Sequence, residues 1–522
     1  MTDRIRLNES NRRWWTLGAM CFALFMIMLD NTVVNVALPS IQADLDTTLA
    51  SLEWTINAYT LTFAVLLVTG GRLGDIFGRR RMFLFGVTVF AGSSAAIGLA
   101  PDQAWLVAGR AAQGVGAAFM MPATLSIITN AFPPEMRGKA IGTWAGVSGL
   151  ALAIGPVVGG FLTEHVSWRA IFFLNLPVAV GAVAVTLFAT HESRDESVER
   201  RIDIPGVATL SIGLTALVLA LIEGNSWGWG SPEIVALLVT AGVGLAAFAF
   251  IELHSRVPMV DFSFFRSSSF VGANAVAFVI SFAMLAVFFF VALYMQNILG
   301  YSALEAGVRF LPATVLIIIT APIAGRLADR FGPQRLIVTG LLLIAVSLFI
   351  ETHITVHSGY ELLLVAFMIM GVGIGLTMSP MSTAAMNAVE TTKAGVASGI
   401  LSMSRMVGGT FGVAAIGALF QAITRHDIDS KLAGLGIGDA QRESLVSAAG
   451  SSGVGDIAQQ VDPEAARQIV TAVQNSFIHA LATAMWLSFS VTVIGAIVAA
   501  LLIERRPVQA HDHAPPLAEA AV

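Results

Sequence analysis

The chain has 522 residues, of which 56% are hydrophobic and only 12% are charged. Soluble proteins carry about a quarter charged residues, so this excess of apolar side chains indicates a lipid environment. The net charge of −5 gives no sign of nucleic-acid binding, and the single cysteine, Cys21, excludes a disulfide framework and a metal site built from several thiolates.

Apolar stretches long enough to cross a membrane, which takes roughly 20 residues, recur along the whole chain. The first follows Arg12 and Arg13 and is too long for a cleaved signal peptide. We predict fourteen spans, at 14–38, 52–72, 81–100, 104–130, 139–162, 168–190, 204–223, 232–252, 269–298, 304–325, 335–356, 360–386, 395–422 and 478–503.

Positive charges are distributed unevenly over the predicted loops. The short loops 40–51, 101–103, 224–231 and 353–360 contain no Lys or Arg, whereas the loops on the other side are rich in both. The positive-inside rule therefore predicts a multi-pass protein of the cell membrane with both termini in the cytoplasm. Residues 424–477 would form a long exterior loop, and 508–522 a disordered cytoplasmic tail.

One loop motif occurs twice. Residues 71–81 follow the second span and residues 325–335 follow the tenth, with matching Gly, Arg, Leu, Asp and Phe at an offset of 254 residues. Two six-helix halves joined directly would be closer together, so we infer two extra helices between them. The predicted division is a bundle at 1–192, linker helices at 193–254 and a second bundle at 255–507.

The repeated motif has a mechanical interpretation. Asp75 and Asp329 can accept hydrogen bonds from the start of a neighbouring helix and pair with loop arginines such as Arg79, while Gly71 and Gly78 allow close approach. Such a cluster would latch the cytoplasmic side shut. The second copy has Pro333 and Gln334 in place of Arg79 and Arg80, which predicts a weaker latch there. The alternative is a basic loop that sets topology alone.

Asp30 is the only acid that we place well inside a predicted span. It lies about eight residues, or roughly 12 Å, from the outer end of the first span, and Arg110 lies roughly 9 Å from the outer end of the fourth. An ionisable group at such depth is costly and usually serves function. We predict that Asp30 carries the coupling proton and that Arg110 tunes its affinity by coming close in one state. A static structural pair is the alternative.

Four residues are candidates for a substrate cavity. Gln113 lies one turn from Arg110, Asn35 lies near Asp30, and Met295 belongs to a group of methionines and phenylalanines that could line an adaptable pocket. Arg405 lies near the middle of the thirteenth span, where no acid is predicted nearby. It would bind either backbone carbonyls or the substrate.

Glycines mark the fifth span. Gly146, Gly149, Gly155 and Gly159 allow close packing, and Pro156 removes a backbone hydrogen bond. A tight, bent helix of this kind could seal a leak beside the cavity, although packing alone would explain each glycine.

These motifs resemble those of the major facilitator superfamily, and specifically its fourteen-helix drug:proton antiporter branch. The matching stretches are 29–39 in the first span, the loop motif 71–81, 110–116 in the fourth span, Gly146 to Gly160 in the fifth span and 168–177 in the sixth. The fifth-span stretch resembles the motif that is associated with antiporters.

The resemblance implies an all-α polytopic fold with two six-helix bundles and two inserted linker helices. It also implies proton-driven export of small amphipathic or drug-like molecules by alternating access. We therefore expect the partners to be a small-molecule substrate, protons and the lipid bilayer, with the protein acting as a monomer. No nucleotide-binding G-x-x-x-x-G-K-[ST] motif occurs, so we expect no enzyme activity, cofactor or metal. A proton-coupled uptake symporter and a non-transporting membrane sensor or enzyme are the alternatives.

Overall fold

The computed structural model describes the chain except for residues 1–7, 48, 196–202, 256–257, 433–462 and 506–522. Within the described residues the chain forms helices and no strand. Thirteen of these helical segments are long and apolar enough to cross a membrane. The predicted fifth span, 139–162, lies within a further 32-residue helix, α5 (Pro134–His165). The predicted tail, 508–522, lies outside the described residues.

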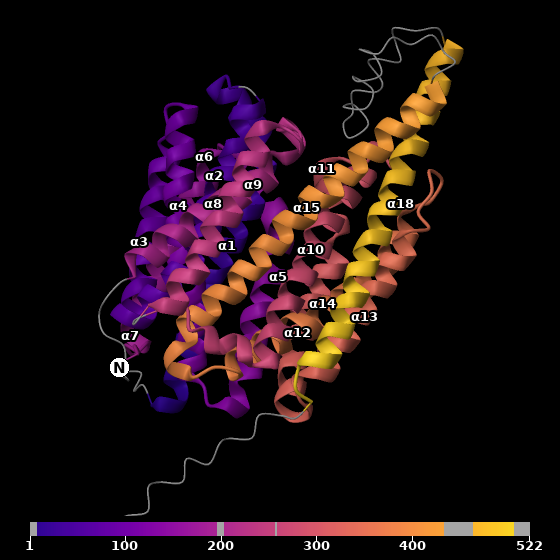
Figure 1. Cartoon of the computed structure of the whole chain (residues 1–522). Helices are drawn as coiled ribbons and strands as arrows, with labels where there is room; N and C mark the ends of the chain where they lie inside the picture. Colours follow the sequence, from indigo (N-terminus) through magenta and orange to yellow (C-terminus); the bar gives the residue numbers. More distant parts are fainter. Residues whose placement is uncertain (1–7, 48, 196–202, 256–257, 433–462, 506–522) are drawn as a thin grey trace, which may run out of the picture.

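The helices fall into two bundles with two helices between them (Figure 1). The first bundle contains α1 (Glu9–Leu45), α2 (Leu49–Phe77), α3 (Arg79–Gly98), α4 (Gln103–Ala131), α5, α6 (Arg169–Phe173) and α7 (Asn175–Ala189). The inserted helices are α8 (Ile204–Trp227) and α9 (Pro232–His254). The second bundle contains η1 (Phe262–Arg266), α10 (Ser268–Asn297), α11 (Ala303–Arg309), α12 (Leu311–Phe331), α13 (Pro333–Glu351), α14 (Tyr360–Asn387), η2 (Thr391–Lys393), α15 (Ala394–Leu432) and α18 (Pro463–Leu502).

Two predicted spans are interrupted. The sixth divides into α6 and α7 around Leu174, and Pro177 cannot donate a backbone hydrogen bond at that point. The tenth divides into α11 and α12 at Phe310, and Pro312 lies at the start of α12. Hydropathy does not register such breaks, because the residues on both sides of each break remain apolar.

Helices continue into both ends of the predicted exterior loop 424–477. α15 continues to Leu432 and α18 begins at Pro463, so both helices extend beyond their apolar stretches. α15 and α18 contact each other, and the Nδ1 atom of His479, at the start of the predicted span 478–503, lies 3.0 Å from Oδ2 of Asp427 in the extension of α15. Polar side chains in this region therefore favour helix–helix contact. The middle of the predicted loop lies outside the described residues.

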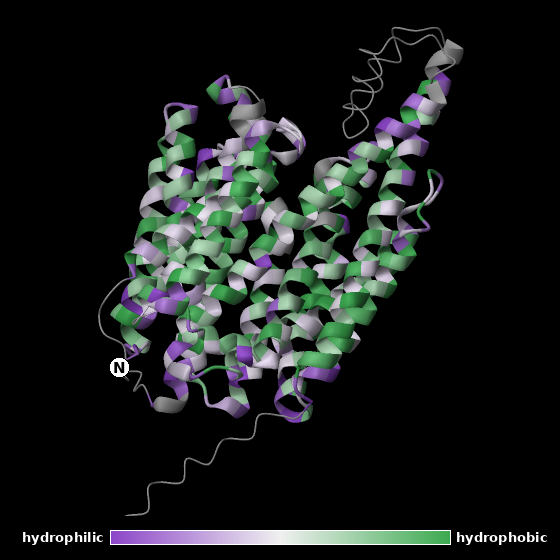
Figure 2. Cartoon of the chain, viewed as in Figure 1, coloured by the Kyte–Doolittle hydropathy of each residue, from purple (hydrophilic) through white to green (hydrophobic). Residues whose placement is uncertain are grey.

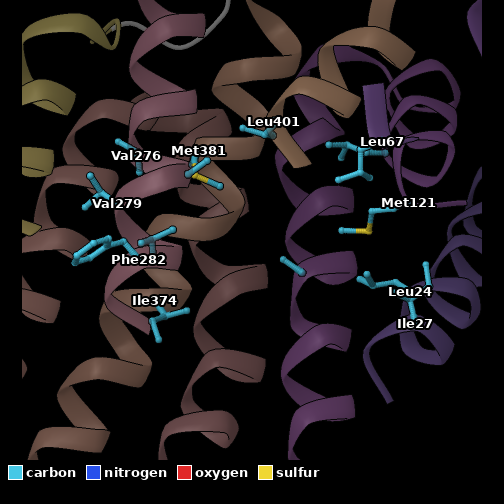
Figure 3. Packing of buried hydrophobic residues seen from close by; sticks show 14 of the residues in the cluster. Leu24, Ile27, Leu67, Met121, Val276, Val279, Phe282, Ile374, Met381 and Leu401 are labelled. Carbon is cyan, nitrogen blue, oxygen red and sulfur yellow. The ribbon is translucent and has the colours of Figure 1, made fainter. Parts of the chain in front are cut away.

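Large apolar side chains cover the outside of the helices (Figure 2). Phe161, Val180, Phe250 and Ile494 each expose more than half of their surface. Such a surface is expected of helices that contact lipid. The internal packing contains Leu24, Leu67 and Met121 in the first bundle and Met381 and Leu401 in the second, on helices that face one another in Figure 3.

The bundles meet chiefly through two helix pairs, α2 with α15 and α5 with α12, and α4 with α15 and α5 with α14 also touch. We call the end where α5 and α15 begin the motif end, because it carries Asp75 and Asp329; it is the lower end in Figure 1. In that view α15 starts beside the first bundle and ends beside α18, so it crosses the boundary between the bundles.

Candidate functional site

Asp30 and Arg110 form a buried ion pair inside the first bundle. Each is only 1% exposed, and Nη1 of Arg110 donates to Oδ2 of Asp30 over 2.5 Å. Asp30 comes from α1 and Arg110 from α4, so the pair also ties these helices together. The structure thus brings together the two residues that the sequence placed at similar depth. Their role in proton coupling stays a prediction.

The second oxygen of Asp30 is also occupied. Gln113 donates through Nε2 to Oδ1 over 2.8 Å, and Asn175 donates through Nδ2 to the same atom over 3.1 Å. The hydroxyl of Ser94 accepts from both amides, at 2.8 and 3.2 Å. Because every donor in this set stabilises the carboxylate, the arrangement fits the charged form of Asp30.

Arg110 has further contacts that fix its position. Its Nε donates to the carbonyl oxygen of Thr55 over 2.9 Å, and its Nη1 lies 2.6 Å from Oε1 of Gln113. The guanidinium carbon lies 4.3 Å from the centre of the Tyr59 ring, a distance typical of a cation–π contact. α1, α2, α3, α4 and α7 therefore all contribute to one network.

Sequence reasoning missed Asn175, Ser94 and Tyr59. Asn175 lies within the quoted stretch 168–177, so a signal for it was present. Ser94 and Tyr59 stand in ordinary apolar helices and carry no such signal. The sequence also missed a second buried acid, since Glu351 at the end of α13 is fully buried beside Ser347.

Asp75 connects the two bundles at the motif end. Arg79 donates to its Oδ1 through Nε and Nη2, over 2.9 and 2.6 Å. The backbone N–H groups of Gly395 and Val396, at the start of α15, donate to the two carboxylate oxygens over 2.9 and 2.8 Å. Arg79 also donates to the carbonyl oxygens of Thr391 and Thr392. The carboxylate thus caps a helix of the opposite bundle.

Asp329 of the second bundle caps a helix of the first bundle in the corresponding way. It accepts from the backbone N–H groups of Gly138 and Lys139, near the start of α5, over 2.9 and 3.1 Å. Among the described residues no arginine forms a hydrogen bond or ion pair with Asp329, and Pro333 occupies the position that Arg79 has in the first copy. Gln334 donates instead to the carbonyl oxygen of Ala500 over 2.6 Å. The second copy therefore has fewer hydrogen bonds across the boundary.

Glycine is required at two points of the motif. A Cβ atom on Gly71 would collide with the carbonyl oxygen of Gly395, so only glycine lets α2 and α15 approach this closely. Gly78 has a φ of +111°, a backbone conformation that other residues rarely adopt, and Gly332 has one of +85° at the matching place. Each forms the sharp turn between two helices.

Two partly exposed groups of ion-paired residues lie outside the membrane spans. Burial disfavours the charge on Asp261, but the 2.7 Å hydrogen bond from Lys393, the hydrogen bonds from Ser263 and the charge of Lys393 together outweigh it and lower the pKa of Asp261 to about 2. Arg169 and Trp168 donate to Asp44, which lowers the pKa of that carboxyl as well. Both acids are therefore charged at neutral pH.

The glycines of α5 contact two different helices. Cβ atoms on Gly146 and Gly149 would lie against Ile318 of α12, whereas those on Gly155 and Gly159 would meet Thr32 and Val33 of α1. Pro156 lies inside α5 next to Gly155. α5 therefore packs tightly on both bundles, as expected of a helix beside the path of transport.

The remaining cavity candidates are not in contact with one another within the described residues. Asn35 is exposed on α1, and its amide donates to the carbonyl oxygen of Asn31. Met295 is fully buried inside the second bundle. Arg405 is half-buried on α15, and Gln113 belongs to the Asp30 network.

Curated relatives of this chain are drug and antibiotic exporters by name. It is 37% identical over 408 residues to the tetracenomycin C resistance and export protein of Streptomyces glaucescens, which covers 78% of this chain and 76% of that protein. It is 38% identical to the puromycin resistance protein of Streptomyces alboniger, covering 79% and 83% of the two chains. It is 31% identical to a multidrug transporter of Bacillus subtilis, covering 81% and 78%.

Solved structures with the same fold are also transporters. A proton:xylose symporter superposes with a TM-score of 0.59 at 12% identity, covering 94% of this chain and 95% of that one. A bacterial homologue of the lysosomal transporter Spinster, in an inward-facing state, gives a TM-score of 0.55 at 17% identity, covering 94% and 97%. At these identities the likeness concerns the fold alone. Residues 20–413 match the Major Facilitator Superfamily, and with the identities above this shows that the chain belongs to that family.

Proposed function

We propose that this protein exports small amphipathic or drug-like molecules in exchange for protons. The names of the relatives support drug-like substrates and transport out of the cell. The observation that carries the exchange is the buried carboxylate of Asp30, held by Arg110 and two amides. A buried acid within a membrane bundle is a group that can take up and release a proton during a transport cycle.

The motif end is cytoplasmic in this proposal, because the loops there carry the Lys and Arg residues. The contacts of Asp75 and Asp329 tie the bundles together at that end. The conformation described here is then closed to the cytoplasm. Opening it would break these helix caps, and the bundles would rock about the proton site to expose it to the other side.

In the proposed cycle the close Asp30–Arg110 pair belongs to the conformation that is closed to the cytoplasm. A proton arriving from outside would neutralise Asp30 and free Arg110. After the bundles rearrange, loss of that proton to the cytoplasm would restore the pair.

Asp30→Asn tests the proposal. Everted membrane vesicles with an imposed pH gradient would be assayed for accumulation of puromycin, tetracenomycin C and fluorescein. We expect wild type to concentrate at least one of them, and Asp30→Asn to lose uphill accumulation while downhill exchange persists. Asp46→Asn is the matched control, because Asp46 is an exposed acid just beyond α1 whose positive φ suits Asn.

Two results would contradict the proposal. Wild-type vesicles that concentrate none of the three compounds would argue against export. An Asp30→Asn variant that still concentrates its substrate and still releases protons on binding would place coupling at another residue.

A further inference from the structure

Arg405 is a cation without a counter-charge. It is half-buried on α15, eleven residues after that helix begins. Its hydrogen-bond partner among the described residues is Ser402, one turn away on the same helix, over a long 3.5 Å. No carboxylate of the described chain forms an ion pair with it, and no nearby charge acts on it. A guanidinium stays charged and offers five N–H donors, so most of its donors are unused.

Trp144 lies beside Arg405 but belongs to the opposite bundle. The guanidinium carbon is 5.9 Å from the centre of the indole ring, at the outer limit of a cation–π contact. Trp144 is 1% exposed, and its Nε1–H finds no acceptor within the described residues. Leaving a buried N–H unpaired costs free energy, and so does leaving a half-buried guanidinium without a counter-charge. Two donor groups thus meet with no acceptor between them among the described residues.

Both residues lie beyond the closed motif end. On α15 Arg405 lies ten residues after Gly395, which contacts Asp75, or roughly 15 Å along the helix. On α5 Trp144 lies six residues after Gly138, which contacts Asp329, or roughly 9 Å along the helix. The backbone of Arg405 is therefore about one turn deeper than that of Trp144, and the two side chains meet across this difference. Both donors lie on the inner side of the contacts that close the motif end.

We propose that Arg405 and Trp144 form an anion subsite, which binds the carboxylate or phenolate group of an organic substrate with an apolar body. The inference rests on the proposed transport function and adds that the transported molecule carries a negative charge. An oxyanion would accept from the guanidinium and from the indole N–H, and so supply the acceptor that the protein lacks. The partly buried Met403 and Met406, on the same helix, offer an adaptable apolar surface for the remainder of the molecule.

The site also has a consequence for the transport cycle. Its two donors come from different bundles, so they separate when the bundles rearrange. An anion bound between them would hold full contact in one conformation only, and its affinity would change as the protein opens and closes.

Binding to the purified full-length protein in detergent, without any proton gradient, tests the proposal apart from transport. Fluorescence anisotropy would follow fluorescein, an aromatic anion, and a rhodamine methyl ester, a cation on a similar ring. We expect Arg405→Gln to weaken fluorescein binding by at least about tenfold, the size expected for a charge-assisted hydrogen bond, and to leave the rhodamine ester unchanged or bound more tightly. Arg405→Lys should retain part of the affinity, and Trp144→Phe should weaken fluorescein binding by about two- to fivefold.

Arg309→Gln is the matched control, because it removes the same charge from an equally half-buried position of the same bundle, where Tyr301 and not Trp144 faces the guanidinium. It should leave fluorescein binding as in wild type. The proposal is overturned if wild type does not bind fluorescein, if Arg405→Gln binds it normally, or if Arg405→Gln weakens both dyes equally. Failure of proton-driven export with normal fluorescein binding would instead count against the proposed function alone.

Discussion

At the residue scale, Asp30 is distinguished by how completely its carboxylate is satisfied. Both oxygens accept hydrogen bonds, from Arg110, Gln113 and Asn175 of α4 and α7. A proton can bind only if some of these contacts loosen, because a protonated carboxyl no longer accepts at both oxygens. Proton uptake and the packing of three helices are therefore linked through one side chain.

Asn175 offers a test of that link. Asn175→Ala removes one of the donors to Oδ1 and loosens the contact of α7 with Asp30. We expect the rate of proton-driven uphill accumulation to fall by about tenfold, since one hydrogen bond to a charged group is worth roughly 1.5 kcal/mol. The measurement is substrate accumulation in everted vesicles with an imposed pH gradient, at matched amounts of protein in the membrane.

Asn274→Ala serves as the control, because Asn274 is a buried amide of the second bundle that bonds Phe270 and Ser404 and not Asp30. It should leave the accumulation rate as in wild type. Equal losses in the two variants, or no loss in Asn175→Ala, would show that Asn175 does not act on Asp30.

At the scale of helices, the two capping aspartates connect the bundles unequally. Asp75 and Asp329 each accept two backbone hydrogen bonds from the opposite bundle. Asp75 is also paired with Arg79 of its own bundle, and Arg79 in turn donates to two carbonyl oxygens across the boundary. Breaking a buried ion pair costs about 3–5 kcal/mol, and a single hydrogen bond costs about 1 kcal/mol. We expect Asp75→Asn to reduce the transport rate at least about tenfold and Asp329→Asn about two- to fivefold, at matched amounts in the membrane. Equal or reversed losses would count against an unequal latch.

The contact between α2 and α15 can be tested without changing charge. Gly71→Ala places a methyl group on the carbonyl oxygen of Gly395, so the two helices must separate. Gly74→Ala is its matched control three residues later, where the nearest atom would be a side-chain carbon of Arg79 at 3.9 Å.

The readout is alkylation of a cysteine placed at the buried Ser398, in a Cys21→Ser background. Gly71→Ala should raise the alkylation rate at least about tenfold, which corresponds to a free energy of opening lower by about 1.4 kcal/mol. Gly74→Ala should leave the alkylation rate unchanged. The same low alkylation rate in both variants would mean that the close contact between α2 and α15 does not hold the motif end closed.

At the scale of the whole molecule, the charge of the loops predicts the orientation in the membrane. The loops at the motif end carry the positive charges, which predicts that this end is cytoplasmic. Single cysteines at the exposed positions Ser226 and Ser263, without Cys21, lie on opposite sides in this prediction. An impermeant thiol reagent added to intact cells should label Ser226→Cys and not Ser263→Cys, with both labelled after lysis. The reverse pattern would invert the topology, and proton and substrate would then move opposite to our proposal.

The sequence by itself determined the membrane class, the positions of the spans and the duplicated motif. Apolar length and loop charge act locally, so each can be read from a short window of residues. The depth of Asp30 and Arg110 followed from the same reading, because a helix rises by a fixed amount per residue. The first-span, loop and fifth-span motifs also pointed to the family that the comparisons confirm.

Only the tertiary structure decided which groups meet. Asp75 is 320 residues from Gly395, Asn175 is 145 residues from Asp30, and Trp144 and Arg405 belong to different bundles. The breaks at Leu174 and Phe310 and the helical extensions beyond the membrane also depend on packing against neighbours. A hydrogen bond requires two atoms within about 3 Å, and this distance is fixed by the relative placement of whole helices, which local sequence patterns do not record.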